Sequence, residues 1–135
     1  MKKLTASGFQ FSNPRTRKVF FQVNDKFDKS RYDGLEVSYD IKVSEKKESS
    51  AVVELEIIAG ADRDASPFYM ELIIASDFRW TDDLKGSEEI FLRQNAVTLL
   101  LSYARPIIAH TTADAGFRPF NLPFMDLRSD IAEIK

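Results

Sequence analysis

Hydrophobic and polar residues alternate through most of the first half of the chain, which predicts β-strands because successive side chains of a strand point to opposite faces. The clearest alternation runs over residues 35–43, and another runs over residues 52–59. Residues 68–75 are apolar on both faces, so we expect them to be central or covered on both sides. Residues 8–23 also alternate, but Asn13-Pro14 should break that strand, because proline cannot donate to a sheet ladder.

The period changes in the second half, where apolar residues recur at helical spacing over residues 90–110. Ser87 is placed to cap the start of this long helix, and Pro106 should kink or split it because proline removes a backbone donor. Gly116 is a natural terminator, and residues 125–134 are expected to form a short C-terminal helix. Strands followed by helices predict one α+β domain spanning residues 1–135, with a four-stranded antiparallel sheet.

Composition narrows the classes of function. The 135 residues carry a formal net charge of −2 and include one histidine and no cysteine. These values argue against a generally basic nucleic-acid binder, and they exclude disulfides, thiolate metal sites and multi-histidine centres. No stretch approaches the roughly 20 apolar residues of a membrane span. Because the residues after Met1-Lys2-Lys3 lack the apolar core of a signal peptide, we expect a cytoplasmic protein.

No residue pattern predicts an active site. The glycines are scattered, and none forms a phosphate-binding loop. Carboxylate pairs such as Asp82-Asp83 and Glu88-Glu89 are typical of solvated surface or of a helix start. A Ser/His/Asp arrangement would have to use His110, which is better explained as a packed or capping residue near a helix end. We therefore expect neither enzymatic activity nor a bound metal or cofactor.

Phenylalanine is over-represented, with eleven residues against four Tyr and one Trp. Several lie on predicted strands or helices, where a core or a subunit interface can absorb them. An irregular stretch near the C-terminus concentrates the apolar residues Phe117, Phe120, Leu122, Phe124, Met125 and Leu127. This stretch either packs back over the sheet or lines a groove for extended chains. Aromatic rings and methionine suit such a groove because they bury large areas and tolerate varied partners.

Two motifs resemble the hallmark stretch of the SecB protein-export chaperones. Tyr103-Ala104-Arg105 lies in the predicted long helix, and Gly116-Phe117-Arg118-Pro119-Phe120-Asn121-Leu122-Pro123 follows it. In that family, a helix carrying Tyr-Ala-Arg leads into a similar proline-containing loop and then a short helix. The order of the earlier elements is also similar, with a long first strand, an aromatic-bearing crossover loop and three further strands.

The resemblance implies an ATP-independent holdase, assembled as a homotetramer (a dimer of dimers), that uses no cofactor and contacts neither nucleic acid nor the membrane interior. Its clients would be unfolded preproteins, kept translocation-competent for the SecA motor. By position, the client-binding residues would be Phe27, Tyr32, Phe117, Phe120, Leu122, Phe124, Met125 and Leu127. The subunit contacts would be Phe68, Met70, Leu72, Ile74, Leu100, Tyr103, Ala104 and Ile107, and the motor would dock at Tyr69 and Glu71.

The first strand departs from the family pattern. Where the family usually presents acidic residues to the motor, this chain has Lys18 and Gln22. Two alternatives to an export chaperone therefore stay open. One is a SecB-like chaperone of a toxin–antitoxin system that holds an antitoxin, and the other is an oligomeric adaptor that binds one folded partner.

Overall fold

Strands make up the first part of the molecule and helices the second in the computed structural model, which describes residues 1–28, 30 and 34–127. The strands are β1 (Phe9–Phe11), β2 (Arg15–Val23), β3 (Val37–Val43), β4 (Ser50–Ala59) and β5 (Phe68–Trp80). The helical part consists of the 3-10 turn η2 (Asp82–Leu84), α1 (Glu88–Ile90), the π-helical turn η3 (Phe91–Asn95) and α2 (Ala96–Asp114). This order confirms the α+β prediction.

β5 organises the sheet, because it pairs with β4 on one side and with both β1 and β2 on the other. β3 pairs with β4 at the opposite edge, and every pairing is antiparallel. The sheet therefore has five strands where four were predicted, since the first strand is broken next to Pro14 and both of its pieces lie along β5. β5 also runs past its predicted end at Ala75, because Phe78 and Trp80 continue its buried face.

The edge formed by β1 and β2 carries two one-residue irregularities. One lies between Phe11 and Arg15, and the other lies at Arg17. Each irregularity shifts the register by one residue, which moves the following side chains to the opposite face of the sheet. The second shift therefore returns the side chains to the faces that they had before the first. As a result, Phe11 and Val19 lie on one face of the sheet, whereas Arg15 and Lys18 lie on the other.

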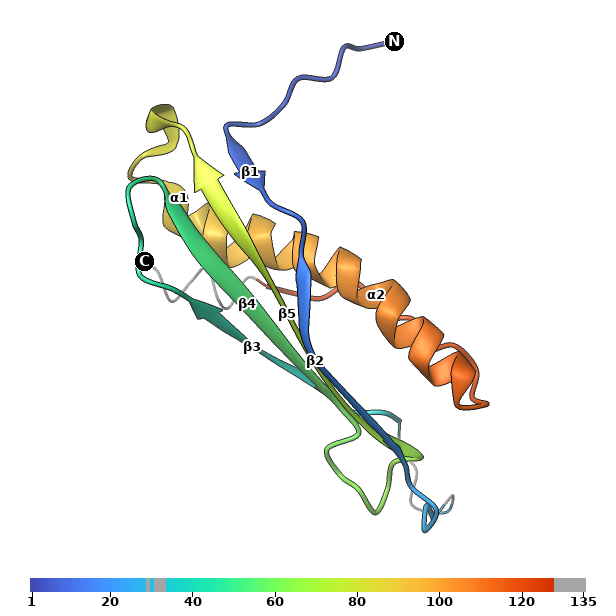
Figure 1. The fold of residues 1–135 in the computed structure, drawn as a ribbon. Helices are drawn as coiled ribbons and strands as arrows, with labels where there is room; N and C mark the ends of the chain where they lie inside the picture. Colours follow the sequence, from blue (N-terminus) through green and yellow to red (C-terminus); the bar gives the residue numbers. More distant parts are fainter. Residues whose placement is uncertain (29, 31–33, 128–135) are drawn as a thin grey trace.

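The long helix covers one face of the sheet, and the other face is open (Figure 1). The buried α2 residues recur every three or four positions, which places them in one stripe facing the sheet. They pack with the buried alternate residues of β4 and β5 into one apolar cluster. Burial of this surface stabilises the fold by about 25 cal/mol per Å².

The helix runs through Pro106 without splitting, so that part of the prediction is not realised. Pro106 is exposed, and the carbonyl of Ser102 that loses its donor also belongs to an exposed residue, where water can bond it. Ser87 is the N-cap residue as predicted, although its side chain makes no capping hydrogen bond. Gly116 adopts φ of 91° just after the helix, as expected for a terminator.

After α2, residues 117–127 form neither helix nor strand and run back beside α2 (Figure 1). Leu122 and Leu127 are buried in the core, so this stretch packs against the domain. Met125 to Leu127 are not helical, and the remainder of the predicted C-terminal helix lies outside the described residues. Within residues 1–28, 30 and 34–127, no helix is long and apolar enough to cross a bilayer.

Candidate functional site

Residues 117–127, called here the return segment, are tied to the end of α2 through Thr112. The Thr112 hydroxyl is fully buried and accepts a hydrogen bond from the backbone N–H of Phe120 at 2.9 Å. The backbone carbonyl of Thr112 accepts another from the N–H of Phe117 at 3.1 Å. The beginning of the return segment is therefore positioned by a single helical residue.

Arg105 fixes the middle of the return segment. Its Nε donates to the carbonyl oxygen of Leu122 and its Nη2 donates to that of Pro123, both at 3.2 Å. A guanidinium can hold two neighbouring carbonyls at once because its donors lie in a planar fork. The backbone of the return segment is thus anchored at both Thr112 and Arg105, two residues that sequence reasoning did not assign to the site.

The anchored backbone displays one aromatic ring completely. Phe124 is 100% exposed, and the Arg105 guanidinium lies 5.9 Å from its ring centroid. The predicted client residues Phe117, Phe120 and Met125 are half-buried against the core. Leu122 and Leu127 are buried, so a client would contact them only if the return segment moved. The surface available without movement therefore centres on Phe124.

The start of the crossover loop lies at the same end of the sheet as Phe117. Phe27 follows β2, whose last residue, Val23, pairs with Phe68. The ring of Phe68 lies 5.4 Å from that of Phe117, which links this strand end to the return segment. The other predicted loop residue, Tyr32, lies outside the described residues.

The predicted motor-docking residues form a network on the open face of the sheet. The Tyr69 hydroxyl donates to the Glu71 carboxylate, which also forms an ion pair with Lys18. Hydrogen bonds from Lys18 and then from Tyr69 lower the pKa of Glu71 below its ordinary value, whereas the bond to Glu71 raises the pKa of Lys18 and of Tyr69. The Arg63 guanidinium lies 3.7 Å from the Tyr69 ring centroid. Glu71 is thus already engaged by a cation of its own chain.

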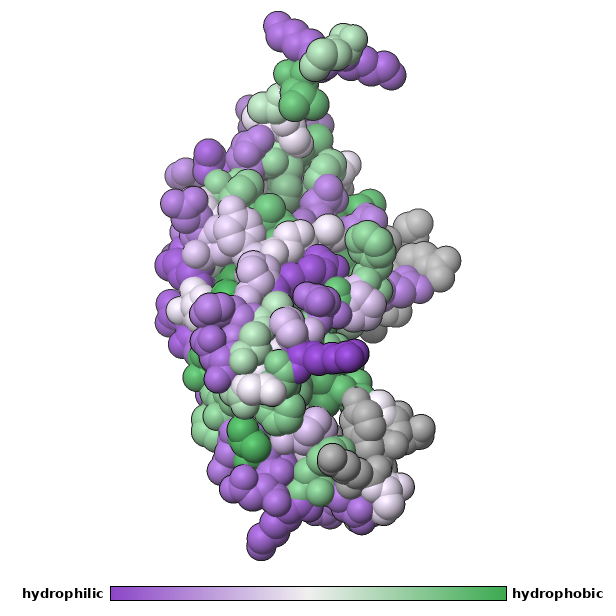
Figure 2. Space-filling model, turned by 90° about the vertical axis from the view of Figure 1, so that its right-hand side faces the viewer, coloured by the Kyte–Doolittle hydropathy of each residue, from purple (hydrophilic) through white to green (hydrophobic). Residues whose placement is uncertain are grey.

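The predicted subunit-contact residues divide into buried and accessible groups. Phe68, Met70, Leu72, Ile74, Leu100 and Ala104 are buried between the sheet and α2 within one chain. Tyr103 is 42% exposed and Ile107 is half-buried. The ring centroids of Tyr103 and Phe11 lie 6.3 Å apart in an edge-to-face arrangement. Val19 is exposed on the same face of the sheet as Phe11. Figure 2, which shows the molecule turned by 90° from Figure 1, shows hydrophobic side chains mixed with hydrophilic ones over this side of the molecule.

His110 was expected to be a packed or capping residue, but its side chain is exposed and its ion-pair partner lies on the same helix. It lies exposed near the end of α2, with its Nε2 3.2 Å from a carboxylate oxygen of Asp114 one turn later. Such a pair is typical of a solvated helix surface. In the part of the chain that the structure describes, no three His, Asp or Glu residues gather as a metal site would require.

Comparison with known proteins identifies one family. The family profile described as preprotein translocase subunit SecB matches residues 6–129. The uncharacterized protein MJ0357 of Methanocaldococcus jannaschii is 25% identical over 130 residues, covering 93% of this chain and 84% of the relative.

Two solved structures share the fold. The Mycobacterium tuberculosis SecB-like chaperone Rv1957, in complex with a ChAD peptide from the Rv1956 HigA1 antitoxin, superposes with a TM-score of 0.67 at 13% identity, covering 87% of this chain and 88% of that one. A protein of unknown function from Streptococcus agalactiae gives 0.56 at 17% identity, covering 89% and 100%. At these low sequence identities, the two matches show a shared fold and do not assign a client to this chain.

Proposed function

The chain belongs to the SecB family, and we propose that it is an ATP-independent holdase that binds extended apolar segments of unfolded proteins. The observation that carries the proposal is the return segment, whose backbone is fixed by Thr112 and Arg105 while Phe124 is fully exposed. A fully exposed Phe on an anchored backbone presents apolar surface to a client. Because its backbone is already ordered, it loses little conformational entropy when the client binds.

Holding requires no reaction on this chain. Burying one aromatic side chain of this size contributes about 1.5–3 kcal/mol before the costs of association. Several such contacts along an extended client would keep the client's own apolar residues from aggregating. Half-buried Phe117 and Phe120 provide additional apolar surface beside Phe124, and the crossover loop with Phe27 and Tyr32 is proposed to complete the groove.

The deciding experiment is light scattering of a protein that aggregates when diluted from denaturant, with the chain added at increasing ratios. Suppression at stoichiometric amounts without ATP is expected. A Phe124→Ser variant should suppress less, while Arg118→Ser, an exposed position on the same segment, should match the wild type. Aggregation that proceeds unchanged at an excess of the chain would refute the holdase. Selective capture of one folded protein, without capture of unfolded chains, would favour the adaptor.

Two kinds of client fit this proposal, preproteins for SecA and an antitoxin. The solved chaperone of similar fold holds an antitoxin peptide, which supports the second. The ion pair between Lys18 and Glu71 also weighs against a basic motor surface, because such a surface would have to displace Lys18. Binding of SecA that is abolished by Glu71→Lys would establish the export role, and SecA binding that ignores this substitution would reject docking at Glu71.

We also propose a cytoplasmic homotetramer, built as a dimer of dimers. Tyr103 and Ile107 lie one turn apart on α2, and Val19 lies on the face of the sheet that α2 covers. These accessible apolar side chains would be covered by further copies of the chain. Light scattering coupled to gel filtration should report a tetramer, and Tyr103→Asp should lower the mass. A monomer at micromolar concentration would contradict this assembly.

A further inference from the structure

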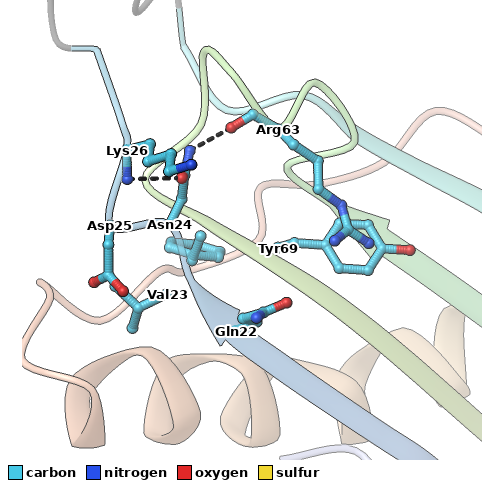
Figure 3. Close-up of a pocket in the computed structure, with 8 residues that line it drawn as sticks. Gln22, Val23, Asn24, Asp25, Lys26, Arg63 and Tyr69 are labelled. Atoms are coloured by element: carbon cyan, nitrogen blue, oxygen red, sulfur yellow. Dashed lines mark hydrogen bonds between the residues drawn. The ribbon is translucent and has the colours of Figure 1, made fainter.

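Asn24 lies where the chain leaves the sheet and enters the crossover loop. It directly follows Val23, the last residue of β2. Its side-chain Nδ2 donates to the backbone carbonyls of Arg63 and Ser66, the latter at 2.9 Å, and its Oδ1 accepts from the backbone N–H of Lys26 at 3.1 Å. Figure 3 shows this side chain between Lys26 and the backbone of Arg63.

The main chain of Asn24 is also fully used. Its N–H donates to the carbonyl of Pro67 at 2.9 Å, and its carbonyl accepts from the N–H of Phe27 at 3.3 Å. Every kind of polar group on Asn24 therefore has a partner, and these partners lie on two different segments. One is the turn between β4 and β5, and the other is the first part of the crossover loop, up to Phe27.

The turn between β4 and β5 is a firm support for this attachment. Gly60 begins it with φ of 78°, and a Cβ there would collide with the carbonyl oxygen of Phe68. The Arg63 guanidinium stacks on Tyr69 of β5 at 3.7 Å. Asn24 consequently connects Phe27 to a turn whose own position is set by the central strand.

We propose that Asn24 is a positioning residue of the client site, which fixes where Phe27 stands relative to the sheet end without contacting the client itself. This inference rests on the proposed holdase function and on the place of Phe27 in its groove. An aromatic residue whose backbone is already ordered loses less conformational entropy when a client binds, and this raises affinity.

Asn24→Asp is the informative substitution, because it keeps the size and the acceptor while replacing the donor by a carboxylate that faces the carbonyls of Arg63 and Ser66. Gln22→Glu is the matched control, since it adds the same charge two residues earlier. Gln22 is exposed and lines the same surface pocket as Asn24. Asn24→Ala removes all the side-chain bonds without adding charge, including the acceptor of the Lys26 N–H, and it is measured beside Asn24→Asp.

The first measurement is hydrogen–deuterium exchange of the amides of Lys26 and Phe27, with the sheet amides as the internal reference. Exchange at the Lys26 amide should accelerate at least about 10-fold in Asn24→Ala, which removes the Oδ1 acceptor of that amide, a bond of about 1.4 kcal/mol. Exchange at the Phe27 amide should accelerate in both Asn24 variants, because loss of the bonds to the carbonyls of Arg63 and Ser66 lets this part of the loop open. The sheet amides and the Gln22→Glu variant should match the wild type. Unchanged exchange at Lys26 and Phe27 overturns the inference, whatever the client measurements give.

The second measurement is fluorescence anisotropy with reduced, carboxymethylated α-lactalbumin as a permanently unfolded client. Asn24→Asp and Phe27→Ala should each weaken binding on the order of 3- to 10-fold, the effect of one side chain's ordering. The double variant should bind no more weakly than Phe27→Ala alone, because Asn24 acts through Phe27. Additive losses would overturn the inference. Failure of the wild type to bind would instead refute the holdase function. The exchange measurement does not require a client, so its result would still stand.

Discussion

Arg105 and Leu122 are joined by a hydrogen bond from the guanidinium Nε to the backbone carbonyl oxygen, 3.2 Å apart, across 17 positions of the chain. The bond is directed at the backbone, so it fixes the course of the return segment and leaves its side chains to other partners. Leu122 turns inward to the core, and two residues later Phe124 turns outward. An inward anchor and an outward ring are thus set by one helical side chain.

Arg105→Lys should loosen the return segment, because a lysine has a single ammonium and cannot hold the carbonyls of Leu122 and Pro123 in the same forked geometry. We expect the free energy of unfolding to fall by about 1–2 kcal/mol and limited proteolysis of the return segment to accelerate. Urea denaturation measures the first effect and mass spectrometry of the fragments the second. Arg118→Lys is the control, and equal behaviour of the two variants would contradict the anchoring role of Arg105.

Thr112→Val should destabilise the chain by about 1–3 kcal/mol, because it leaves the N–H of Phe120 without its acceptor at a buried position. The substitution preserves the shape of the side chain, so the effect reports the hydroxyl. Thr111→Val is a matched control, since the Thr111 hydroxyl bonds the Ile107 carbonyl within its own helix. Denaturant midpoints that fall equally for both variants would count against a role in holding the return segment.

Phe124→Ala and Leu122→Ala should separate client binding from stability. The exposed ring of Phe124 contributes little to folding, so its removal should leave the denaturation midpoint unchanged while client affinity falls. Removal of the buried Leu122 side chain should cost about 2–5 kcal/mol of stability. Denaturation and anisotropy of each variant make the comparison, and a large stability loss in Phe124→Ala would show that its ring is packed in solution.

Glu71 should give the open face a pH-dependent stability. Its pKa is lowered from 4.5 by the hydrogen bonds from Lys18 and Tyr69, so its contribution is present above that value and is lost as the pH falls through the folded-state pKa. Wild type should therefore be more stable than Glu71→Gln at neutral pH, with the difference vanishing in acid and shrinking in high salt. Glu36→Gln, at an exposed position outside this network, is the control. A difference that persists in acid would exclude the ionised Glu71 as its source.

Much of the fold could be predicted because its signals are local. The break at Asn13-Pro14, the strand predicted over residues 35–43 and the end of the helix at Gly116 each depend on a few neighbouring residues. All three were confirmed, although the strand begins two residues later than predicted, at Val37. The extension of β5 to Trp80 was missed although Asp77 and Arg79 alternate with buried Phe78 and Trp80. The π-helical turn η3 was also missed, because a single wide turn leaves little mark on helical periodicity.

The candidate site was predictable in its apolar residues and not in its anchors. The concentration of Phe and Leu after Gly116 pointed to the return segment, but periodicity does not say which of these side chains turns inward. Arg105 was identified only as part of the Tyr103-Ala104-Arg105 motif, and the sequence around Thr112 and Asn24 did not indicate their roles. Their roles depend on hydrogen bonds to backbone atoms 8 to 42 positions away, which no local pattern encodes.

The paired irregularities on the β1–β2 edge restrict how this region can change in length. Deleting the extra residue at Arg17 alone would leave the first irregularity uncompensated, and one part of the edge would then present its polar residues to the core. Deletions that remove both irregularities together would keep Phe11 and Val19 facing α2. Between these two residues, insertions and deletions among relatives should therefore come in pairs, because a change of one residue would exchange the buried and exposed faces of the strand.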